Sequence, residues 1–100
     1  MSKIDISFEE TGAKGRYIAA VEGFHEPADL TFSRAGETRI IVDHTGVPES
    51  LRGQGVGAAL AARVVEDARA QGLTIVPLCP FFKAQATRHP EWADVVQGLS

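Results

Sequence analysis

Three glycines stand at alternate positions in the segment RGQGVG, Arg52 to Gly57, where a helix is expected to begin. Glycine lowers helix stability by about 1 kcal/mol against alanine, so their presence here needs a separate reason. A helix start offers backbone N–H groups without intrahelical partners and a partial positive charge. Because Gly53, Gly55 and Gly57 lack side chains, a phosphate could approach these groups closely, and Arg52 would add a fixed positive charge. The segment therefore predicts an anion site.

Better-known glycine motifs do not match this segment. It lacks the Gly-Lys-Ser/Thr ending of a nucleotide P-loop and the G-x-G-x-x-G spacing of a dinucleotide-binding unit. The structural alternative is a flexible turn with a glycine entry to the helix, and the glycine spacing alone leaves this alternative open.

Two side chains near this segment can move protons or form covalent bonds. His44 precedes the glycines, and the ordinary histidine pKa of about 6.5 suits proton removal near neutral pH. Cys79 is the only cysteine, so we expect no internal disulfide and no cysteine-based metal cluster. Each has a structural alternative: His44 would hold the loop by hydrogen bonding, and Cys79 would be a small buried residue. We expect no metal, because no His, Asp and Glu residues have the spacing of metal ligands.

The elements that position these residues begin with a run of strands. Apolar and polar residues alternate with a period near two, which indicates strands at 3–10, 16–23, 28–36 and 38–45. Short turns separate them, so we expect an antiparallel meander. The strand at 16–23 has apolar residues on both faces, which predicts a central strand covered on both sides.

From Gly46 onward the apolar period becomes helical. Val56, Leu60 and Val64 recur at steps of four, which predicts an amphipathic helix ending near Gly72. A short apolar fifth strand follows at residues 73–78.

The chain end at 81–99 predicts one or two short helices, and Pro90 opens the second. Because a strand-helix-strand unit places its two strands parallel, we expect an α+β fold with a mainly antiparallel sheet of about five strands, parallel only between the fourth and fifth. Ligands favour the carboxyl ends of such parallel strands, and this point is the glycine loop.

Length and charge exclude several classes of protein. One hundred residues with 44% hydrophobic content indicate one domain, residues 1–100. The net charge is -3 and the basic residues are scattered, so we expect no nucleic-acid binding. No apolar stretch approaches the ~20 residues that span a bilayer, so we expect no membrane contact and a cytoplasmic location.

The segment at 52–57, after a β meander and before an amphipathic helix, resembles the phosphate-binding signature of the GNAT N-acetyltransferase superfamily. The strings HTGVPESLRGQGVGAALA at 44–61, PLCPF at 77–81 and RHPEW at 88–92 look more narrowly like its small, YjdJ-type single-domain branch. The resemblance implies a GNAT-like fold that binds acetyl-CoA or CoA, with the pyrophosphate on the loop backbone and the pantetheine arm between the fourth and fifth strands. The cofactor-binding residues that it implies are Thr45, Val47, Arg52, Gly53, Gln54, Gly55, Val56 and Gly57.

Two departures from the family pattern bear on the chemistry. Only TGAKG stands where longer members have helices that build the acceptor site, and Gln85 stands in a segment where the small branch leads us to expect a tyrosine. His44, at the end of the expected fourth strand, is the candidate base for acetyl transfer. Cys79 is a candidate acyl acceptor or proton donor to the departing CoA. Arg88 and His89 either meet the nucleotide end of CoA or form a solvated turn before the helix that Pro90 opens.

We therefore expect acetyl transfer from acetyl-CoA to an amine of a small molecule or an exposed protein site. The alternative is a non-catalytic acyl-CoA or CoA-binding module that contacts a protein partner, and a third possibility is a structural interaction domain. We expect a monomer or a weak dimer.

Overall fold

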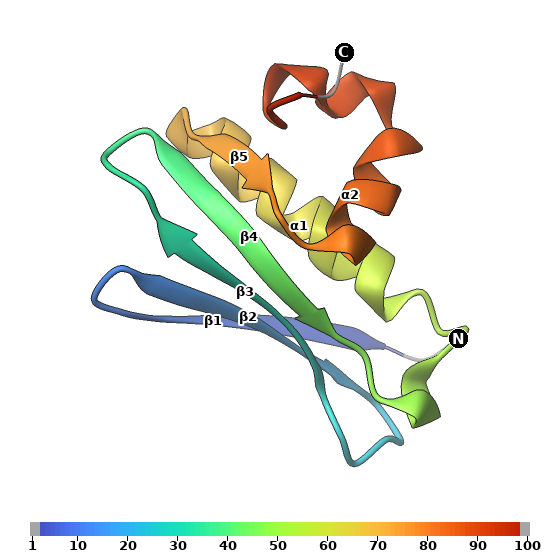
Figure 1. The fold of residues 1–100 in the computed structure, drawn as a ribbon. Coiled ribbons are helices and arrows are strands. Elements are labelled where there is room, and N and C mark those ends of the chain that lie inside the picture. The colour runs from blue at the N-terminus through green and yellow to red at the C-terminus, as the bar shows by residue number, and fades with distance from the viewer. Residues whose placement is uncertain (1–2, 99–100) are drawn as a thin grey trace.

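Five strands form one sheet in the order β1-β2-β3-β4-β5, so that each strand lies beside its neighbours in sequence. The structure is a computed structural model that describes residues 3–98. The first four strands pair antiparallel and β4 pairs parallel with β5, which confirms the predicted fold class (Figure 1). The strands are β1 (Ile4–Thr11), β2 (Lys14–Val21), β3 (Ala28–Arg34), β4 (Arg39–Gly46) and β5 (Thr74–Pro77).

The meander follows from alternating side chains and tight turns. In β3, Ala28, Leu30 and Phe32 are buried while the residues between them are half-buried, as expected for a strand with one covered face. β1 and β2 are joined through Gly12 and Ala13. Gly12 has a φ of 60°, which glycine adopts readily in tight hairpin turns.

One long helix, α1 (Val56–Gln71), covers one face of the sheet and contacts β2, β3 and β5. Its apolar positions, including Leu60 and Val64, are fully buried. At its end Gly72 has a φ of 70°, and the N–H of Leu73 donates to the carbonyl of Ala68 at 2.8 Å. A left-handed glycine with such a bond is a common helix stop, so the predicted end near Gly72 is confirmed.

The chain end forms α2 (Pro80–Thr87) and the short 3₁₀ helix η2 (Pro90–Asp94). Pro90 opens η2 as predicted, although the helix is 3₁₀ and not α. Phe82 is fully buried, and its ring stacks on Trp92 with centroids 6.3 Å apart. No helix within residues 3–98 is long and apolar enough to cross a membrane.

The prediction that β2 is covered on both faces was wrong. Tyr17, Ala19 and Val21 are buried on the face toward α1, whereas Ile18 is only half-buried and Ala20 is exposed. The reason is the helix layer: α1 packs on the face that carries Tyr17, and the described helices leave the opposite face open. β2 is central only in having a strand on each side.

Candidate functional site

Left-handed glycines shape the turn that leads into α1. After β4 the chain forms the 3₁₀ turn η1 (Glu49–Leu51) and then reaches α1 through residues 52–55. Gly53 and Gly55 have φ angles of 83° and 75°, a region that costs other residues roughly 1–2 kcal/mol. A Cβ atom at either position would meet no atom within 4 Å. Backbone conformation, and not crowding, therefore requires glycine at these two positions.

The N-terminus of α1 carries no side-chain cap. Gly55 occupies the cap position, and its carbonyl accepts a hydrogen bond from the N–H of Ala59 at 3.1 Å. The N–H groups that precede Ala59 in the first turn have no carbonyl within the helix to bind. They are therefore suited to an acceptor that comes from outside the helix.

Gly57 is required for a different reason, which is contact with α2. A Cβ atom built on Gly57 would lie 2.4 Å from Cζ of Phe81, well inside van der Waals contact. The Phe81 side chain therefore rests directly on the backbone of the first turn of α1. From the sequence, all three glycines are expected to let a phosphate approach. The structure adds a conformational reason for Gly53 and Gly55 and a packing reason for Gly57.

β4 and β5 separate just before this turn. Their pairing ends at Val42 and Pro77, where the carbonyl of Val42 accepts hydrogen bonds from the N–H groups of Leu78 and Cys79 at 3.1 and 3.0 Å. β4 continues to Gly46 without β5 beside it. This opening, here called the β4/β5 gap, lies at the carboxyl ends of the only parallel pair among the described strands.

A cavity of about 640 Å³ lies between the glycine turn, the end of β4 and α2. Pockets for small molecules commonly measure ≈ 300–1,000 Å³, so this one is large enough to hold a cofactor-sized ligand in part. Its lining residues are Thr45, Val47, Leu51, Arg52, Gly53, Gly55, Val56, Gly57, Ala58, Phe81, Gln85 and Arg88.

The cavity combines positive charge with apolar surface. Arg52 comes from the glycine turn and Arg88 from the end of α2, and both side chains line the cavity. Among residues 3–98, no carboxylate lines it. Together with the uncapped helix start, this favours an anionic ligand that also carries an apolar part. Residues 3–98 contain no group of His, Cys, Asp or Glu side chains suited to a metal ion.

Comparison with known families shows to which family this chain belongs. Residues 16–95 match the family described as GCN5-related N-acetyl-transferase. The chain belongs to this family. The match begins within β2 and ends just after η2, so it includes the glycine turn and all the residues that line the cavity. It confirms the superfamily that the sequence motifs indicated, and the narrower YjdJ-type branch stays a prediction.

Two solved structures are similar to this GCN5-related chain. An NMR structure of a GCN5-like protein from Staphylococcus aureus, described as a proposed N-acetyltransferase, is 32% identical, with a TM-score of 0.71, and the match covers 94% of this chain and 90% of that one. The crystal structure of nourseothricin acetyltransferase is 26% identical, with a TM-score of 0.54, over 63% of this chain and 38% of that one. No curated protein matches the sequence.

The structure separates the predicted site residues of this family member into two groups. Seven of the eight residues predicted to bind the cofactor line the cavity, and Gln54 does not. His44 and Cys79 do not line it either. His44 is exposed and pairs in register with Thr31, on the sheet face away from α1. Cys79 is buried, and its Sγ donates to Oγ1 of Thr45 at 3.4 Å.

His44 reaches the outer face partly through a β-bulge. The pairing of β3 with β4 shifts between Thr31 and Phe32, so that Asp43 has no register partner. Asp43 instead accepts a hydrogen bond from Oγ1 of Thr31 at 2.6 Å. This local irregularity could not be read from an alternating pattern, which is why the sequence placed His44 near the glycine turn without fixing its face.

Arg88, a candidate from the sequence for the nucleotide end of CoA, lines the cavity, and His89 does not. Sequence reasoning missed the other residues that α2 contributes. Phe81 and Gln85 lie one helical turn apart and both line the cavity, with Arg88 just beyond them. Their i, i+4 spacing was the available signal. From the sequence, Gln85 was notable only for standing where a tyrosine is expected, and Phe81 was not predicted to line a site.

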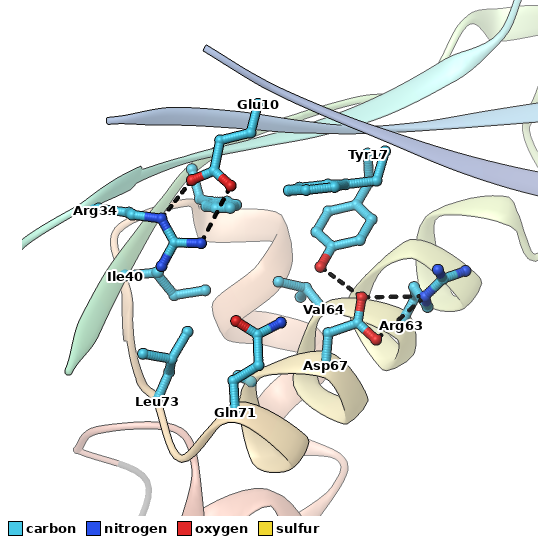
Figure 2. Close-up of a pocket in the computed structure, with 12 residues that line it drawn as sticks. Glu10, Tyr17, Arg34, Ile40, Arg63, Val64, Asp67, Gln71 and Leu73 are labelled. Atoms are coloured by element: carbon cyan, nitrogen blue, oxygen red, sulfur yellow. Dashed lines mark hydrogen bonds and ion pairs between the residues drawn. The ribbon is translucent and has the colours of Figure 1, made fainter. Parts of the chain in front are cut away.

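A smaller second cavity of about 230 Å³ lies near the other end of α1 (Figure 2). The Tyr17 hydroxyl donates to Oδ2 of Asp67 at 2.7 Å, and Arg63 also binds this carboxylate. Arg34 of β3 forms an ion pair with Glu10 of β1 on the sheet side of the cavity. Since these charged groups satisfy one another, we interpret this cavity as a feature of the edge of the core and not as a ligand site.

Proposed function

We propose that this chain binds acetyl-CoA in the cavity beside the glycine turn and transfers the acetyl group to an amine. The observation that carries the proposal is the position of this cavity, at the carboxyl ends of β4 and β5 and against the uncapped start of α1. Membership of the GCN5-related N-acetyl-transferase family supports the same ligand.

The lining residues fit the chemistry of CoA in two parts. The pyrophosphate would accept hydrogen bonds from the N–H groups of the turn and of the first turn of α1, with Arg52 and Arg88 as positive partners. The pantetheine arm would lie along the half-buried Val47 and the Phe81 ring toward the β4/β5 gap. Thr45, on the part of β4 that has no β5 beside it, would line the end of the arm that lies in the β4/β5 gap.

Bound acetyl-CoA supplies a thioester whose carbonyl carbon an amine can attack. The new C–N bond replaces the C–S bond, the amine loses one proton, and the departing thiolate takes up one. His44 and Cys79 stay predictions for these proton transfers. His44 is exposed on the sheet face away from α1, where an acceptor could reach it. Cys79 is buried and its Sγ contacts Thr45.

The acceptor would be presented from outside the domain. Only Gly12 and Ala13 lie between β1 and β2, so no helices there enclose a second substrate. We therefore propose an exposed amine on a small molecule or a protein as the acceptor.

A second candidate function, a non-catalytic CoA-binding module, is favoured by one observation. Neither His44 nor Cys79 lines the cavity, and no tyrosine does. A module of this kind would bind CoA and acetyl-CoA with similar affinity and release no thiol.

Turnover separates these two functions. The full chain is incubated with acetyl-CoA and a panel of amines, and free thiol is measured. Thiol release that depends on an amine supports transfer. Release no faster than the uncatalysed rate with every amine, together with tight CoA binding, supports the module. His44→Ala and Cys79→Ala then test each side chain, and intact mass detects an acetyl adduct on Cys79.

A further inference from the structure

The two edges of the sheet differ in how they are covered. At the β5 edge, the N–H of Ile75 donates to the carbonyl of Val95 at 2.8 Å, and the N–H of Gln97 donates to the carbonyl of Ile75 at 2.8 Å. At the opposite edge β1 pairs with β2 on one side only, and no segment within residues 3–98 pairs with its outer side. Figure 1 shows β1 as the outermost strand of the meander.

β1 carries few of the features that prevent pairing at exposed edges. Its register with β2 runs without a bulge from Ile4 to Thr11, and it contains neither proline nor lysine. Natural edge strands are commonly protected by bulges, prolines or lysines. Its inward side chains are only partly covered, since Ile4 and Ile6 are half-buried and Phe8 is 45% exposed. This strand is therefore suited to pairing with another strand.

The free hydrogen-bonding groups of β1 belong to its even-numbered residues. The carbonyl of Lys3 accepts a hydrogen bond from the N–H of Glu22 at 3.0 Å, so Lys3 faces β2 with its backbone groups. Bonded and non-bonded positions alternate along an antiparallel strand. Because the register is unbroken, the backbone groups of Ile4, Ile6 and Phe8 point toward the free edge.

We propose that the chain forms a homodimer in which two β1 strands pair antiparallel about a two-fold axis through Ile6. The two sheets then join into one. In this register Ile4 lies opposite the partner's Phe8, and Ile6 lies opposite the partner's Ile6, so apolar side chains meet on one face. All three of these residues use the backbone groups that β2 leaves free.

Charge and apolar contact together favour this register over its neighbours. With the axis through Ile6, Lys3 lies opposite the partner's Glu9, and Asp5 lies opposite the partner's Ser7. These are the non-hydrogen-bonded positions, where side chains approach most closely. Opposite charges across such a pair are favourable and like charges are not.

An axis through Ile4 also sets opposite charges together, Lys3 against the partner's Asp5, but it leaves Phe8 outside the strand pair. Three other neighbouring registers lack the charge match or the apolar match. An axis through Ser7 sets Asp5 against the partner's Glu9, and an axis through Asp5 sets two aspartates against each other. An axis through Phe8 sets Ile6 against the partner's Glu10. The first two bring like charges together, and the third sets an apolar side chain against a carboxylate, so none matches the register centred on Ile6.

The dimer is expected to be weak, because one strand pair makes a small interface. Sedimentation equilibrium of the full chain, from low micromolar to millimolar concentration, should show a mass that rises from the 10.7 kDa of one chain toward twice that value. Ile6→Lys places two like charges at the axis and should raise the dissociation constant at least about tenfold. A single-chain mass for the unmodified protein at every concentration overturns the proposal.

Charge reversal tests the register itself. Lys3→Glu and Glu9→Lys should each weaken the dimer, because each sets like charges opposite each other. The double variant restores the pair and should dimerise like the original chain. Glu37→Lys, an exposed change in the turn between β3 and β4, is the control for net charge and should have no effect. A double variant weaker than both single variants contradicts the register.

Amide hydrogen exchange gives a second readout that does not depend on substitutions. Raising the chain concentration should slow exchange at Ile4, Ile6 and Phe8, whose N–H groups face the partner. Exchange at Asp5 and Ser7 should change little, since β2 already protects these amides. Dimerisation without this alternation would assign the contact to another surface. The β1 edge lies across the sheet from the cavity, so failure here leaves the proposed acetyl-CoA site untouched.

Discussion

A Cβ atom on Gly57 would lie 2.4 Å from Cζ of Phe81, so α1 and α2 touch where the proposed ligand would bind. Gly57→Ala should force the Phe81 ring, which is 37% exposed, to move toward the cavity. We expect acetyl-CoA affinity to fall about tenfold. The free energy of unfolding should change by less than about 1 kcal/mol, because alanine favours the helix. Calorimetric titration and urea unfolding measure the two quantities.

The matched control removes the ring that causes the clash. Phe81→Ala added to Gly57→Ala frees the space, so the double variant should bind acetyl-CoA no more weakly than Phe81→Ala alone. A full loss of affinity in the double variant would show that Gly57 acts through the backbone and not through Phe81.

The two cavity arginines should act through phosphate charge. Arg52→Ala and Arg88→Ala should each weaken acetyl-CoA binding about tenfold or more, since hydrogen bonds to charged groups contribute ≈ 1.5–3 kcal/mol. Binding of acetyl-pantetheine, which has no pyrophosphate, should be unchanged. Arg39→Ala, an exposed change at the start of β4, is the control. Equal losses with both ligands would contradict the assignment.

The Tyr17 hydroxyl is expected to stabilise the fold rather than take part in transfer. It donates to Asp67 at 2.7 Å from a buried ring, so Tyr17→Phe should lower the free energy of unfolding by about 1 kcal/mol. Turnover should be unchanged, because Tyr17 does not line the acetyl-CoA cavity. Urea unfolding and the thiol-release assay check both points, and a large loss of turnover without loss of stability would oppose this view.

The same residue should govern part of the alkaline stability. Burial, and then the hydrogen bond to Asp67, raise the pKa of Tyr17 well above its ordinary value of 10.0. A pKa raised by folding contributes stability below pH 10, and this contribution is lost as the pH rises toward the folded value. Tyr17→Phe should therefore show a shallower loss of stability above pH 10 than the unmodified chain. Parallel alkaline unfolding curves would refute this role.

The ion pair between Arg69 of α1 and Asp94 of η2 should lose its contribution to stability in acid. Arg69 binds the Asp94 carboxylate with two hydrogen bonds of 2.9 and 2.8 Å, and the bond from Arg69 lowers the pKa of Asp94 below 3.8. A lowered pKa contributes stability above that value, and the contribution is lost as the pH falls through the folded value. Asp94→Asn should therefore reduce the loss of stability between about pH 5 and pH 2. Thermal unfolding across that range measures it, and an unchanged slope would count against the pair.

The order of the elements could be predicted from the sequence because each depends on local patterns. The period of two in 28–36, the steps of four from Val56 to Val64, and Gly72 as a helix stop all act over a few residues. The glycine turn was also predicted from a local signal, the three glycines directly before the helical pattern. The parallel pairing of β4 with β5 followed from the handedness and length of a strand-helix-strand unit.

The parts that could not be predicted depend on contacts between distant segments. Nothing near Gly57 in sequence indicates that Phe81 rests on it, and the covering of one face of β2 depends on where α1 lies. The face of His44 depends on a bulge opposite Thr31. These features follow from packing in three dimensions, which a single sequence does not contain.

The central claim is that the left-handed glycine turn holds the pyrophosphate of acetyl-CoA. Calorimetric titration with acetyl-CoA, with CoA, ATP and NADH alongside, tests it most directly. Gly55→Glu changes the turn, and Gly12→Glu, at a φ of 60° in the distant hairpin, introduces similar strain elsewhere. We predict saturable binding of acetyl-CoA and CoA that Gly55→Glu abolishes and Gly12→Glu retains. No binding of either ligand by the unmodified chain would contradict the account and leave the turn a structural feature of the fold.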